Sequence, residues 1–310
     1  MTGRVHYGIN NIYTVQSESG ELLECRIKGK VLGGGVVYNP LSPVDRVEID
    51  TASAVPGQGL ITRRLPRSND LTRRNRKRQA PQVLAANVDQ CICILSPENP
   101  PFRPRFADRV LVSAMRTGIP VTVLLNKIDL GSKREIGERL EVFAGLGCGV
   151  LTASAETGAG LDAVRSALEG RTTVFLGQSG VGKSTLVNRL IPGANRKTRD
   201  ISGKYNRGRH TTVYALLLEG EGFEIIDTPG IREIEVYGIG SAELEGYFPE
   251  FEPFRRECKF PSCTHLHEPG CGVIRALEEG IIHPDRYESY MRIYIDLEER
   301  EKAAYGKTYG

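Results

Sequence analysis

The amino-acid sequence predicts a multidomain protein with an all-β N-terminal domain, a central α/β domain and a helical, metal-binding C-terminal domain. Three observations predict this class. Short alternating stretches broken by Gly, Pro and Asn fill residues 1–72, and strands alternate with helices over residues 73–233. A cluster of Cys and His residues stands within residues 234–310. A chain of 310 residues is long enough for each of these domains to bury a core.

Composition and hydropathy exclude several classes of protein. Hydrophobic residues make up 40% of the chain and charged residues 25%, which are ordinary values for a globular protein. No run of about 18 apolar residues predicts a membrane span, and the first residues lack the apolar stretch of a secretory signal. Seven cysteines, an odd number, without an export signal favour reduced thiols and a cytoplasmic location. We expect a monomer without a membrane partner.

The charge is unevenly spread along the chain. The formal charge is +3, but residues 63–78, the basic segment, hold eight Lys or Arg against one Asp, a net charge of +7. The other residues therefore form a mildly acidic body. This pattern indicates a polyanionic partner such as nucleic acid. A solvated linker with no partner is the alternative.

In the N-terminal part, four short stretches have the alternation of strands. They are residues 11–15, 22–27, 30–38 and 46–49. Glycine and proline clusters between them indicate frequent turns. Short strands of this kind predict a small β-barrel or a β-sandwich, and the pattern does not choose between the two.

In the central part, apolar runs alternate with amphipathic stretches. The expected strands are residues 88–95, 121–125, 149–152, 172–176, 213–218 and 223–226, and the expected helices are residues 105–117, 134–146 and 161–168. Strands that alternate with helices form βαβ units and hence a mostly parallel sheet. In the C-terminal part, apolar side chains recur at helical spacing over residues 286–302, which predicts the packed face of a helix.

A glycine-rich loop, the phosphate loop, follows the predicted strand 172–176. Its residues are Gly177, Gln178, Ser179, Gly180, Val181, Gly182, Lys183, Ser184 and Thr185, which fit G-x-x-x-x-G-K-[ST]. Because a helical run follows directly, backbone amides and the helix N-terminus can cradle a phosphate. Lys183 would reach the outer phosphates and Ser184 would bind Mg²⁺.

The segment of residues 227–230, Asp-Thr-Pro-Gly (the D-T-P-G segment), follows another predicted strand. Asp227 can hold Mg²⁺, usually through water, and Gly230 can offer its N–H to the last phosphate. Alone, D-x-x-G is a common turn. The phosphate loop makes a nucleotide site the stronger interpretation.

Two further strand ends carry residues suited to recognising a base. They are Asn126, Lys127 and Asp129 in N-K-x-D, and Ser154, Ala155 and Glu156 in the S-A-E loop. A carboxylate such as Asp129 accepts from N1–H and the N2 amine of guanine, which adenine lacks. We expect Asn126 to tie this loop to the phosphate loop, the Lys127 stem to lie over the base, and an S-A-E amide to meet guanine O6. An ordinary turn is the alternative for N-K-x-D alone, but together the motifs predict GTP or GDP with Mg²⁺.

The order of these motifs is unusual. In Ras-like GTPases the phosphate loop comes first and N-K-x-D comes late, whereas here both base motifs precede the phosphate loop. A circular permutation can give the same site, because domain termini often lie close together. The segment after residue 230, which senses the last phosphate, then runs directly into the C-terminal domain. Nucleotide state can therefore move that domain.

Hydrolysis needs a group that orients water. Ras-like proteins use a Gln just after D-x-x-G, but Ile231 stands there and cannot hydrogen-bond water, so we expect slow intrinsic turnover. His210, in a basic loop before Asp227, is the best local substitute. A solvated loop residue is the alternative for His210. Thr211 or Thr212 would coordinate Mg²⁺ in the GTP state.

Four soft metal ligands lie close together in the C-terminal part. They are Cys258, Cys263, His265 and Cys271, in the pattern C-x₄-C-x-H-x₅-C. This set suits one tetrahedral Zn²⁺ in a filled, structural site, with His267 as a competing ligand. The other cysteines, Cys25, Cys91, Cys93 and Cys148, lie in or beside apolar runs and are expected to be packing residues.

With these motifs in place, the chain resembles the RsgA (YjeQ) family of circularly permuted bacterial GTPases over nearly its full length. The resemblance depends on the order of the motifs above and on G-R-H-T-T at residues 208–212. It implies an N-terminal OB-fold, a permuted GTPase domain and a zinc domain. It also implies late maturation of the small ribosomal subunit, GTP hydrolysis stimulated by that subunit, and His210 near the attacking water. The basic segment would then extend an OB-fold surface toward rRNA.

Two other classes of function stay open on the sequence. One is a regulatory GTP-binding module with a protein partner, for which the basic segment is incidental. The other is a zinc-dependent hydrolase, which requires an open metal position that four ligands do not leave. GTP turnover that responds to RNA and is stimulated by the small subunit would favour the expected function over a regulatory GTP-binding module.

Overall fold

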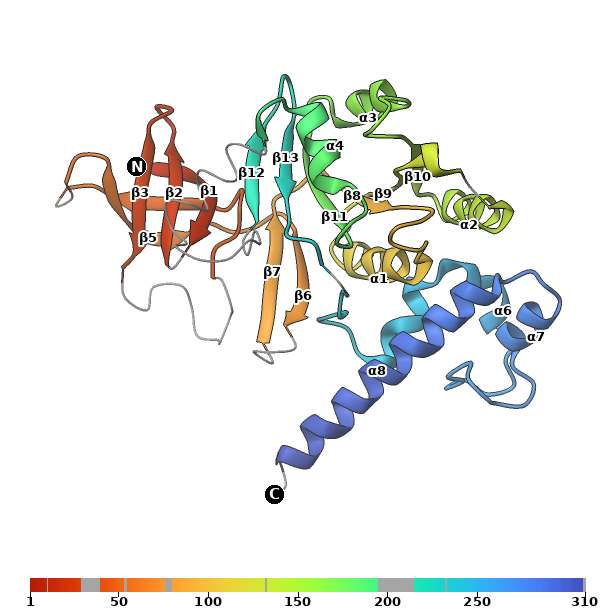
Figure 1. Cartoon of the computed structure of the whole chain (residues 1–310). Coiled ribbons are helices and arrows are strands. Elements are labelled where there is room, and N and C mark those ends of the chain that lie inside the picture. The colour runs from red at the N-terminus through yellow and green to blue at the C-terminus, as the bar shows by residue number, and fades with distance from the viewer. Residues whose placement is uncertain are drawn as a thin grey trace.

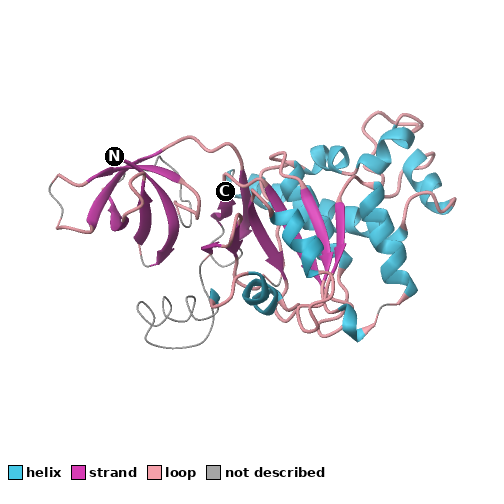
Figure 2. Cartoon of the chain, turned by 90° about the horizontal axis from the view of Figure 1, so that it is seen from above, coloured by secondary structure: helices cyan, strands magenta, loops and turns pink. Residues whose placement is uncertain are grey.

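The structure is a computed structural model of the chain. It describes residues 1–9, 11–28, 40–52, 55–75, 80–131, 133–194, 215–231 and 233–308, with side chains as far as residue 304. Figure 1 shows a strand-rich barrel, a central sheet with helices, and a group of short helices crossed by one long helix. The view from above in Figure 2 places the barrel on one side of the central sheet.

The N-terminal strands close into a five-stranded barrel in the order β1-β2-β3-β5-β4. Its strands are β1 (Thr2–Ile9), β2 (Ile12–Ser17), β3 (Leu22–Ile27), β4 (Arg46–Asp50) and β5 (Gln58–Arg64). Strand β1 pairs with both β2 and β4, which closes the barrel. Alternate side chains point inward, and Val5, Val15 and Ile61 are fully buried. The structure therefore confirms the barrel rather than the sandwich.

The sequence pattern locates only part of this barrel. Strands β2, β3 and β4 lie where the alternation predicts strands, whereas β1 and β5 lie outside the predicted stretches. The pattern of β5 is hidden because the strand ends in Arg63 and Arg64, which belong to the basic segment. The predicted strand at residues 30–38 lies outside the described residues.

A separate hairpin connects the barrel to the central domain. Its strands β6 (Asp70–Asn75) and β7 (Ala80–Ala86) pair antiparallel. Leu71 and Leu84 are buried in an apolar cluster of the central domain. Residue 72, where the sequence pattern places the first domain boundary, lies inside β6.

Six strands form the central sheet in the order β10-β9-β8-β11-β13-β12. They are β8 (Gln90–Leu95), β9 (Val121–Leu125), β10 (Gly149–Thr152), β11 (Thr172–Gly177), β12 (Leu216–Glu219) and β13 (Glu224–Asp227). Neighbouring strands are parallel except β12, which is antiparallel to β13. The mostly parallel sheet is therefore confirmed.

Helices cover both faces of this sheet. They are α1 (Pro104–Met115), α2 (Arg134–Gly145), α3 (Leu161–Leu168) and α4 (Lys183–Leu190), with a short turn η1 (Ile128–Leu130). Side chains of α1 and α2 share one apolar cluster with the sheet, and those of α3 and α4 share another. Because the carboxyl ends of parallel strands meet at one edge, the loops that follow β8, β9, β10, β11 and β13 gather there.

The C-terminal helices pack around aromatic side chains. They are η2 (Ser241–Tyr247), η3 (Pro249–Phe251), α6 (Glu252–Arg255), α7 (Gly272–Glu278) and the long α8 (Pro284–Thr308). Phe248, Phe251 and Tyr290 are buried at the centre, with ring centroids 4.9–5.4 Å apart. Tyr290, Ile293 and Leu297 form the buried face of α8, which confirms the predicted helix. Within the described residues, no helix has the length and apolarity needed to span a membrane.

A buried ionic cluster joins α8 to the central domain. Asp108 of α1 accepts hydrogen bonds from Arg139 of α2 at 2.6 Å and from Arg286 of α8 at 2.9 Å. All three residues are at most 1% exposed, and Ser289 of α8 also donates to Asp108. Because buried charges must be paired, this cluster fixes the start of α8 against α1 and α2.

Candidate nucleotide and metal sites

The phosphate loop curls between β11 and α4. Gly180 and Gly182 have φ angles of 90° and 89°, a left-handed conformation in which a side chain would be strained. Gly182 also has no space for one, because a Cβ would lie 2.4 Å from Nδ2 of Asn126. Ser184 and Thr185 are exposed in the first turn of α4. The loop thus has the backbone shape that cradling a phosphate requires.

The D-T-P-G segment lies directly against the phosphate loop. A Cβ on Gly230 would lie 3.1 Å from Cα of Ser179, so the two backbones almost touch. The N–H of Ile231 donates to the carbonyl oxygen of Gly177 at 3.2 Å. The Ile231 side chain is buried in the apolar core. The structure therefore brings two motifs that are distant in sequence to one place, with Ile231 turned into the core.

Lys183 joins these two motifs through charge. Its ammonium group donates to the carboxylate of Asp227 and to the carbonyl oxygen of Thr228. Lys183 and Asp227 are each 7% exposed, so their ion pair is buried. The residues expected to bind phosphates and Mg²⁺ thus neutralise one another.

Asn126 ties three motifs together. Its Nδ2 donates to the carbonyl oxygen of Val181 in the phosphate loop at 2.8 Å. Its Oδ1 accepts from the N–H of Ala155 in the S-A-E loop at 3.0 Å. The side chain is fully buried. The first contact is the tie to the phosphate loop that the sequence predicts.

The rest of N-K-x-D is held by contacts with two other loops. Lys127 donates to the carbonyl oxygen of Asn99 at 2.5 Å, and its Cε lies 3.6 Å from the place of a Cβ on Gly182. The Lys127 stem therefore runs beside the phosphate loop. Asp129 is exposed, and its carboxylate accepts from the hydroxyl of the buried Ser154.

Two contacts at this site involve residues that the sequence analysis does not single out. Arg189, near the end of α4, donates to the carbonyl oxygens of Ala155 at 2.9 Å and Glu156 at 2.6 Å. The loop before α1 also covers the phosphate loop, because Cδ of Pro100 lies 3.3 Å from the place of a Cβ on Gly180. Neither contact has a sequence signal, since each joins segments far apart in the chain.

The residues predicted to assist hydrolysis lie outside the described residues. His210, Thr211 and Thr212 belong to residues 195–214, which the structure does not describe. Their roles stay predictions that follow from the sequence.

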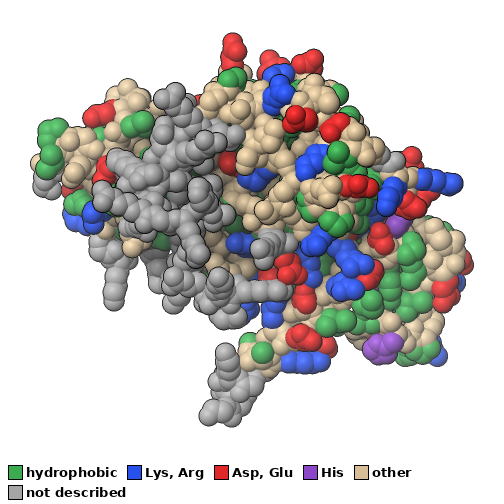
Figure 3. Space-filling model, in the orientation of Figure 1, with side chains coloured by type: hydrophobic (Ala, Val, Ile, Leu, Met, Phe, Trp, Pro, Cys, Tyr) green, Lys and Arg blue, Asp and Glu red, His purple; other side chains and the backbone are tan. Residues whose placement is uncertain are grey.

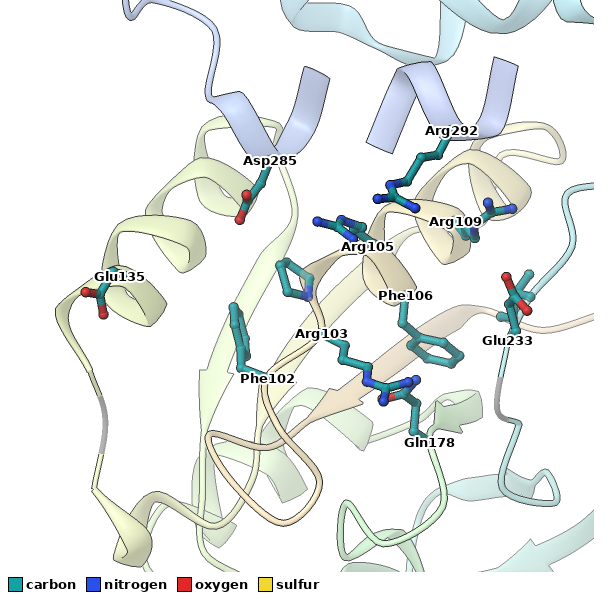
Figure 4. A pocket seen from close by; sticks show the side chains of 12 residues that line it. Phe102, Arg103, Arg105, Phe106, Arg109, Glu135, Gln178, Glu233, Asp285 and Arg292 are labelled. Atoms are coloured by element: carbon teal, nitrogen blue, oxygen red, sulfur yellow. The ribbon is translucent and has the colours of Figure 1, made fainter. Parts of the chain in front are cut away.

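A cavity of about 700 Å³ lies between the phosphate loop and the C-terminal helices (Figure 4). Among the residues that line it are Gln178 of the phosphate loop, Arg105 of α1, Glu233 of the segment after D-T-P-G, and Arg292 of α8. Arg105 and Arg292 both pair with Glu288, at 2.5 Å and 2.8 Å. The phosphate loop and the segment after D-T-P-G thus share one space with α8.

Two arginines in the described part of the basic segment, Arg63 and Arg67, pair with acids of the barrel domain. Arg67 contacts both carboxylate oxygens of the buried Asp45 at 2.7 Å, and Arg63 pairs with Glu48 at 2.5 Å. Residues 76–78 of the segment lie outside the described residues. On the face shown in Figure 3, Lys and Arg side chains are interspersed with Asp and Glu over the central and C-terminal parts. The described part of the basic segment therefore stabilises the barrel as well as adding positive charge.

The predicted metal ligands meet at one point of the C-terminal part. The ligand atoms of Cys258, Cys263, His265 and Cys271 all lie within 4.8 Å of one another. Nδ1 of His265 is 3.3 Å from Sγ of Cys271 and 3.6 Å from Sγ of Cys258. The competing ligand His267 is exposed and stands outside this group. Three thiols and an imidazole in a closed set fit a structural Zn²⁺ and leave no open position for hydrolytic chemistry.

The surroundings of this cluster suit a cation. His265 is 1% exposed, and its Nε2 lies 2.8 Å from the carboxylate of Glu245, a contact that directs Nδ1 toward the thiols. Burial raises the pKa of Cys263 to about 12 and also raises the pKa of Cys271. The N–H of Ile274 donates to Sγ of Cys271 at 3.5 Å. A bound divalent cation would therefore be the group that stabilises these thiols in their charged form.

Comparisons with known sequences agree with this geometry. The family model for the RsgA GTPase matches residues 64–237. A relative from Chlorobaculum parvum is 40% identical over 93% of this chain and 95% of its own length, and one from Bacteroides fragilis is 39% identical over 98% and 100%. Both relatives are named small ribosomal subunit biogenesis GTPase RsgA.

Solved structures agree as well. YjeQ from Thermotoga maritima matches with a TM-score of 0.71 and 32% identity, over 96% of this chain and 98% of that one. YloQ, a circularly permuted GTPase, matches with a TM-score of 0.64 and 26% identity, over 96% and 95%. The permuted motif order, the fold and the family model lead to one conclusion: this chain belongs to the RsgA GTPase family and is a GTP-hydrolysing enzyme.

Proposed function

We propose that this GTPase binds the small ribosomal subunit and its rRNA, assists late maturation of that subunit, and hydrolyses GTP to GDP and phosphate faster when bound to it. The supporting observation is the extent of the match. Relatives named small ribosomal subunit biogenesis GTPases align with 93–98% of the chain. The barrel and the Cys/His cluster, which a nucleotide site does not need, are thus part of the shared sequence.

We propose further that this GTPase is a cytoplasmic monomer with three domains. Residues 1–72 form an RNA-binding barrel domain, residues 73–233 the permuted GTPase domain, and residues 234–310 the zinc domain. The pairing of Arg4 in β1 with Glu224 in β13 supports communication between the first two. Burial alone would raise the pKa of Glu224, but the hydrogen bonds from Arg4 and Thr172 hold this pKa below its usual value. Strand β13 ends at Asp227, so the barrel is linked to a strand that reaches the nucleotide site.

Guanine is the base that this site recognises in the proposal. The carboxylate of Asp129 accepts from N1–H and the N2 amine, and an amide of the S-A-E loop donates to O6. The same carboxylate facing adenine would stay unpaired, which opposes ATP. The hydrogen bonds of Asn126 to the phosphate loop and to the S-A-E loop support this assignment, because they hold the base and phosphate parts of the site together.

Nucleotide binding exchanges the partners of Lys183 and Asp227. Lys183 would turn from Asp227 to the outer phosphates, and Asp227 and Ser184 would hold Mg²⁺, which would neutralise phosphate charge. The phosphate loop, residues 177–185, supplies backbone amides. Gly230 offers its N–H to the last phosphate, a role that its closeness to Ser179 supports.

His210 orients the attacking water in this proposal. Ile231 cannot do so, since its side chain is apolar and buried. Thr211 or Thr212 would coordinate Mg²⁺ in the GTP state. Because His210 replaces the usual Gln, turnover is slow in the free protein and rises when the small subunit is bound.

The segment after D-T-P-G is held on two sides, which supports transmission of the nucleotide state. On one side, the N–H of Arg74 in β6 donates to the carbonyl oxygen of Glu235 at 3.1 Å. On the other side, Arg300 of α8 donates to the carbonyl oxygen of Val236 at 2.9 Å. A shift of the D-T-P-G segment toward the last phosphate would therefore move both the hairpin and α8.

One structural Zn²⁺ holds the ligand loop against α8 in this proposal. Its ligands are Cys258, Cys263, His265 and Cys271. Tyr287 and Tyr290 of α8 support this role, because their hydroxyls donate to the carbonyl oxygens of His265 at 2.7 Å and Thr264 at 2.9 Å. The ion thus stabilises the surface on which the long helix rests.

Co-sedimentation with purified ribosomal subunits tests the proposed partner. We expect the protein to sediment with small subunits in the presence of a non-hydrolysable GTP analogue, to do so less with GDP, and to leave large subunits free. Equal binding to both subunits would contradict the proposal. A preparation that binds GTP but neither ribosomal subunit would also contradict the proposal, and the partner would then be sought among proteins.

A further inference from the structure

Helix α4 contacts the nucleotide site at both of its ends. Its first residue, Lys183, belongs to the phosphate loop. Near its last residue, the guanidinium of Arg189 donates through Nε to the carbonyl oxygen of Ala155 at 2.9 Å and through Nη2 to that of Glu156 at 2.6 Å. Both acceptors lie in the S-A-E loop. One short helix therefore connects the phosphate side of the site with the base side.

The two carbonyl contacts determine the direction of an amide. A trans peptide is planar, so a carbonyl that points toward Arg189 turns the N–H of the next residue the opposite way. The N–H of Ala155 donates to Asn126, and that of Thr157 donates to the hydroxyl of Ser154 at 3.1 Å. The N–H of Glu156 has no hydrogen-bond acceptor among the described residues. It is the amide of the loop that stays available to a ligand.

The backbone at Arg189 is tied to α3, while the Arg189 side chain stays exposed. Arg165 of α3 donates to the backbone carbonyl oxygen of Arg189 at 3.2 Å and pairs with Asp162 at 3.3 Å. The Arg189 side chain is exposed, so it contributes little to the core. Its replacement is therefore expected to change the loop more than the stability of the domain.

We propose that Arg189 is a positioning residue for guanine selectivity. By holding the carbonyl oxygens of Ala155 and Glu156, it aims the N–H of Glu156 at the C6 oxygen of the base. Arg189 lies at the end of α4 away from the phosphate loop and acts through the S-A-E loop. The inference extends the guanine site proposed above and does not depend on the ribosomal partner.

Nucleotides that differ only at the base test this role. The probes are GDP, IDP, which keeps the C6 oxygen, and 6-thio-GDP, which has a weakly accepting sulfur there but keeps N1–H and the N2 amine. In Arg189→Ala, we expect GDP and IDP to bind about tenfold more weakly, the size of one well-oriented hydrogen bond. Binding of 6-thio-GDP should fall less than about threefold, because the amide contributes little to it.

Three further measurements separate positioning from a structural effect. Arg189→Lys, which can reach one carbonyl oxygen, should lose less GDP affinity than Arg189→Ala. Arg134→Ala on α2, whose side chain is 90% exposed and pairs with Glu138, is the matched control and should bind like the wild type. With GTP as substrate, Arg189→Ala should raise KM and leave kcat unchanged.

Two outcomes would overturn the role of Arg189: unchanged GDP affinity in Arg189→Ala, or equal weakening of all three nucleotides, which would indicate general loosening of the loop. If Arg189→Ala does not fold, the same comparison is made with Arg189→Lys. Equal affinity of the wild type for GDP and 6-thio-GDP would instead reject the amide contact of the proposed guanine site. Subunit binding is measured separately, so its failure would leave these results intact.

Discussion

Lys183 and Asp227 form a buried ion pair that joins the phosphate loop to the D-T-P-G segment. Both charges are expected to bind nucleotide, yet each is neutralised by the other before nucleotide arrives. Because an unpaired buried charge is costly, the pair keeps the site assembled. Removing one partner should therefore affect both ligand binding and local stability.

Lys183→Ala should lower GTP turnover by at least about 100-fold, since the outer phosphates lose their cation and Asp227 is left unpaired. Phosphate release measures the turnover, and metal analysis should show the zinc content unchanged. Arg134→Ala serves as the exposed control and should keep wild-type turnover. Retained turnover in Lys183→Ala would reject this nucleotide site and reopen the zinc-dependent hydrolase.

Asp129→Asn should weaken GDP binding about 100-fold, because an amide cannot accept from both N1–H and the N2 amine of guanine. Xanthine carries an oxygen at C2, to which the new amide can donate, so binding of XDP should improve. Titration calorimetry with both nucleotides measures the change. Asp162→Asn on α3, where the carboxylate is fully exposed, is the control. Parallel losses for GDP and XDP would show that Asp129 does not read the base.

Glu245→Gln should weaken zinc binding about 10–100-fold, because the carboxylate orients His265 and increases its basicity. Competition with a chromogenic chelator measures the affinity, and Glu252→Gln, which removes an exposed carboxylate at the start of α6, is the control.

Zinc affinity should also rise with pH between about pH 6 and 8. Burial raises the pKa of Cys263 to about 12 without a cation, so zinc binding must release protons, and release becomes easier as pH increases. An affinity that does not change with pH would contradict thiolate ligation.

Asp108→Ala should reduce the free energy of unfolding by about 3–5 kcal/mol, because Arg139 and Arg286 would keep buried charges without their shared partner. Asp296→Ala removes the partner of Arg109 at a half-buried position and should cost at most about 1 kcal/mol. Urea unfolding compares the two. Similar losses for both variants would show that the buried cluster does not fix α8.

The sequence predicts elements well where one physical pattern dominates. The bounds of β9, β10 and α3 agree with the prediction because apolar runs or amphipathic periodicity are uninterrupted there. The pattern fails at β5, since two arginines continue the strand beyond its buried residues. The mostly parallel sheet follows from the alternation of strands and helices, which needs no exact bounds.

The candidate site is predictable to the extent that its chemistry lies in local motifs. The phosphate loop, N-K-x-D and the four metal ligands are contiguous or closely spaced, so the sequence contains them. The sequence favours His265 but leaves His267 as a competing ligand, because only the fold shows which imidazole the loop buries. Arg189 and Glu245 could not be found, since their contacts join segments that only the fold brings together.

GTP turnover with and without purified small ribosomal subunits, at low and high salt, shows whether the small subunit activates this GTPase. Wild type, His210→Ala and Lys183→Ala are compared. We expect strong stimulation of the wild type that fades with salt, as binding to an RNA polyanion requires. We also expect weak stimulation of His210→Ala with nearly unchanged GTP affinity, and no turnover for Lys183→Ala. Wild-type turnover that small subunits leave unchanged, in protein that binds GTP, would contradict the proposed function.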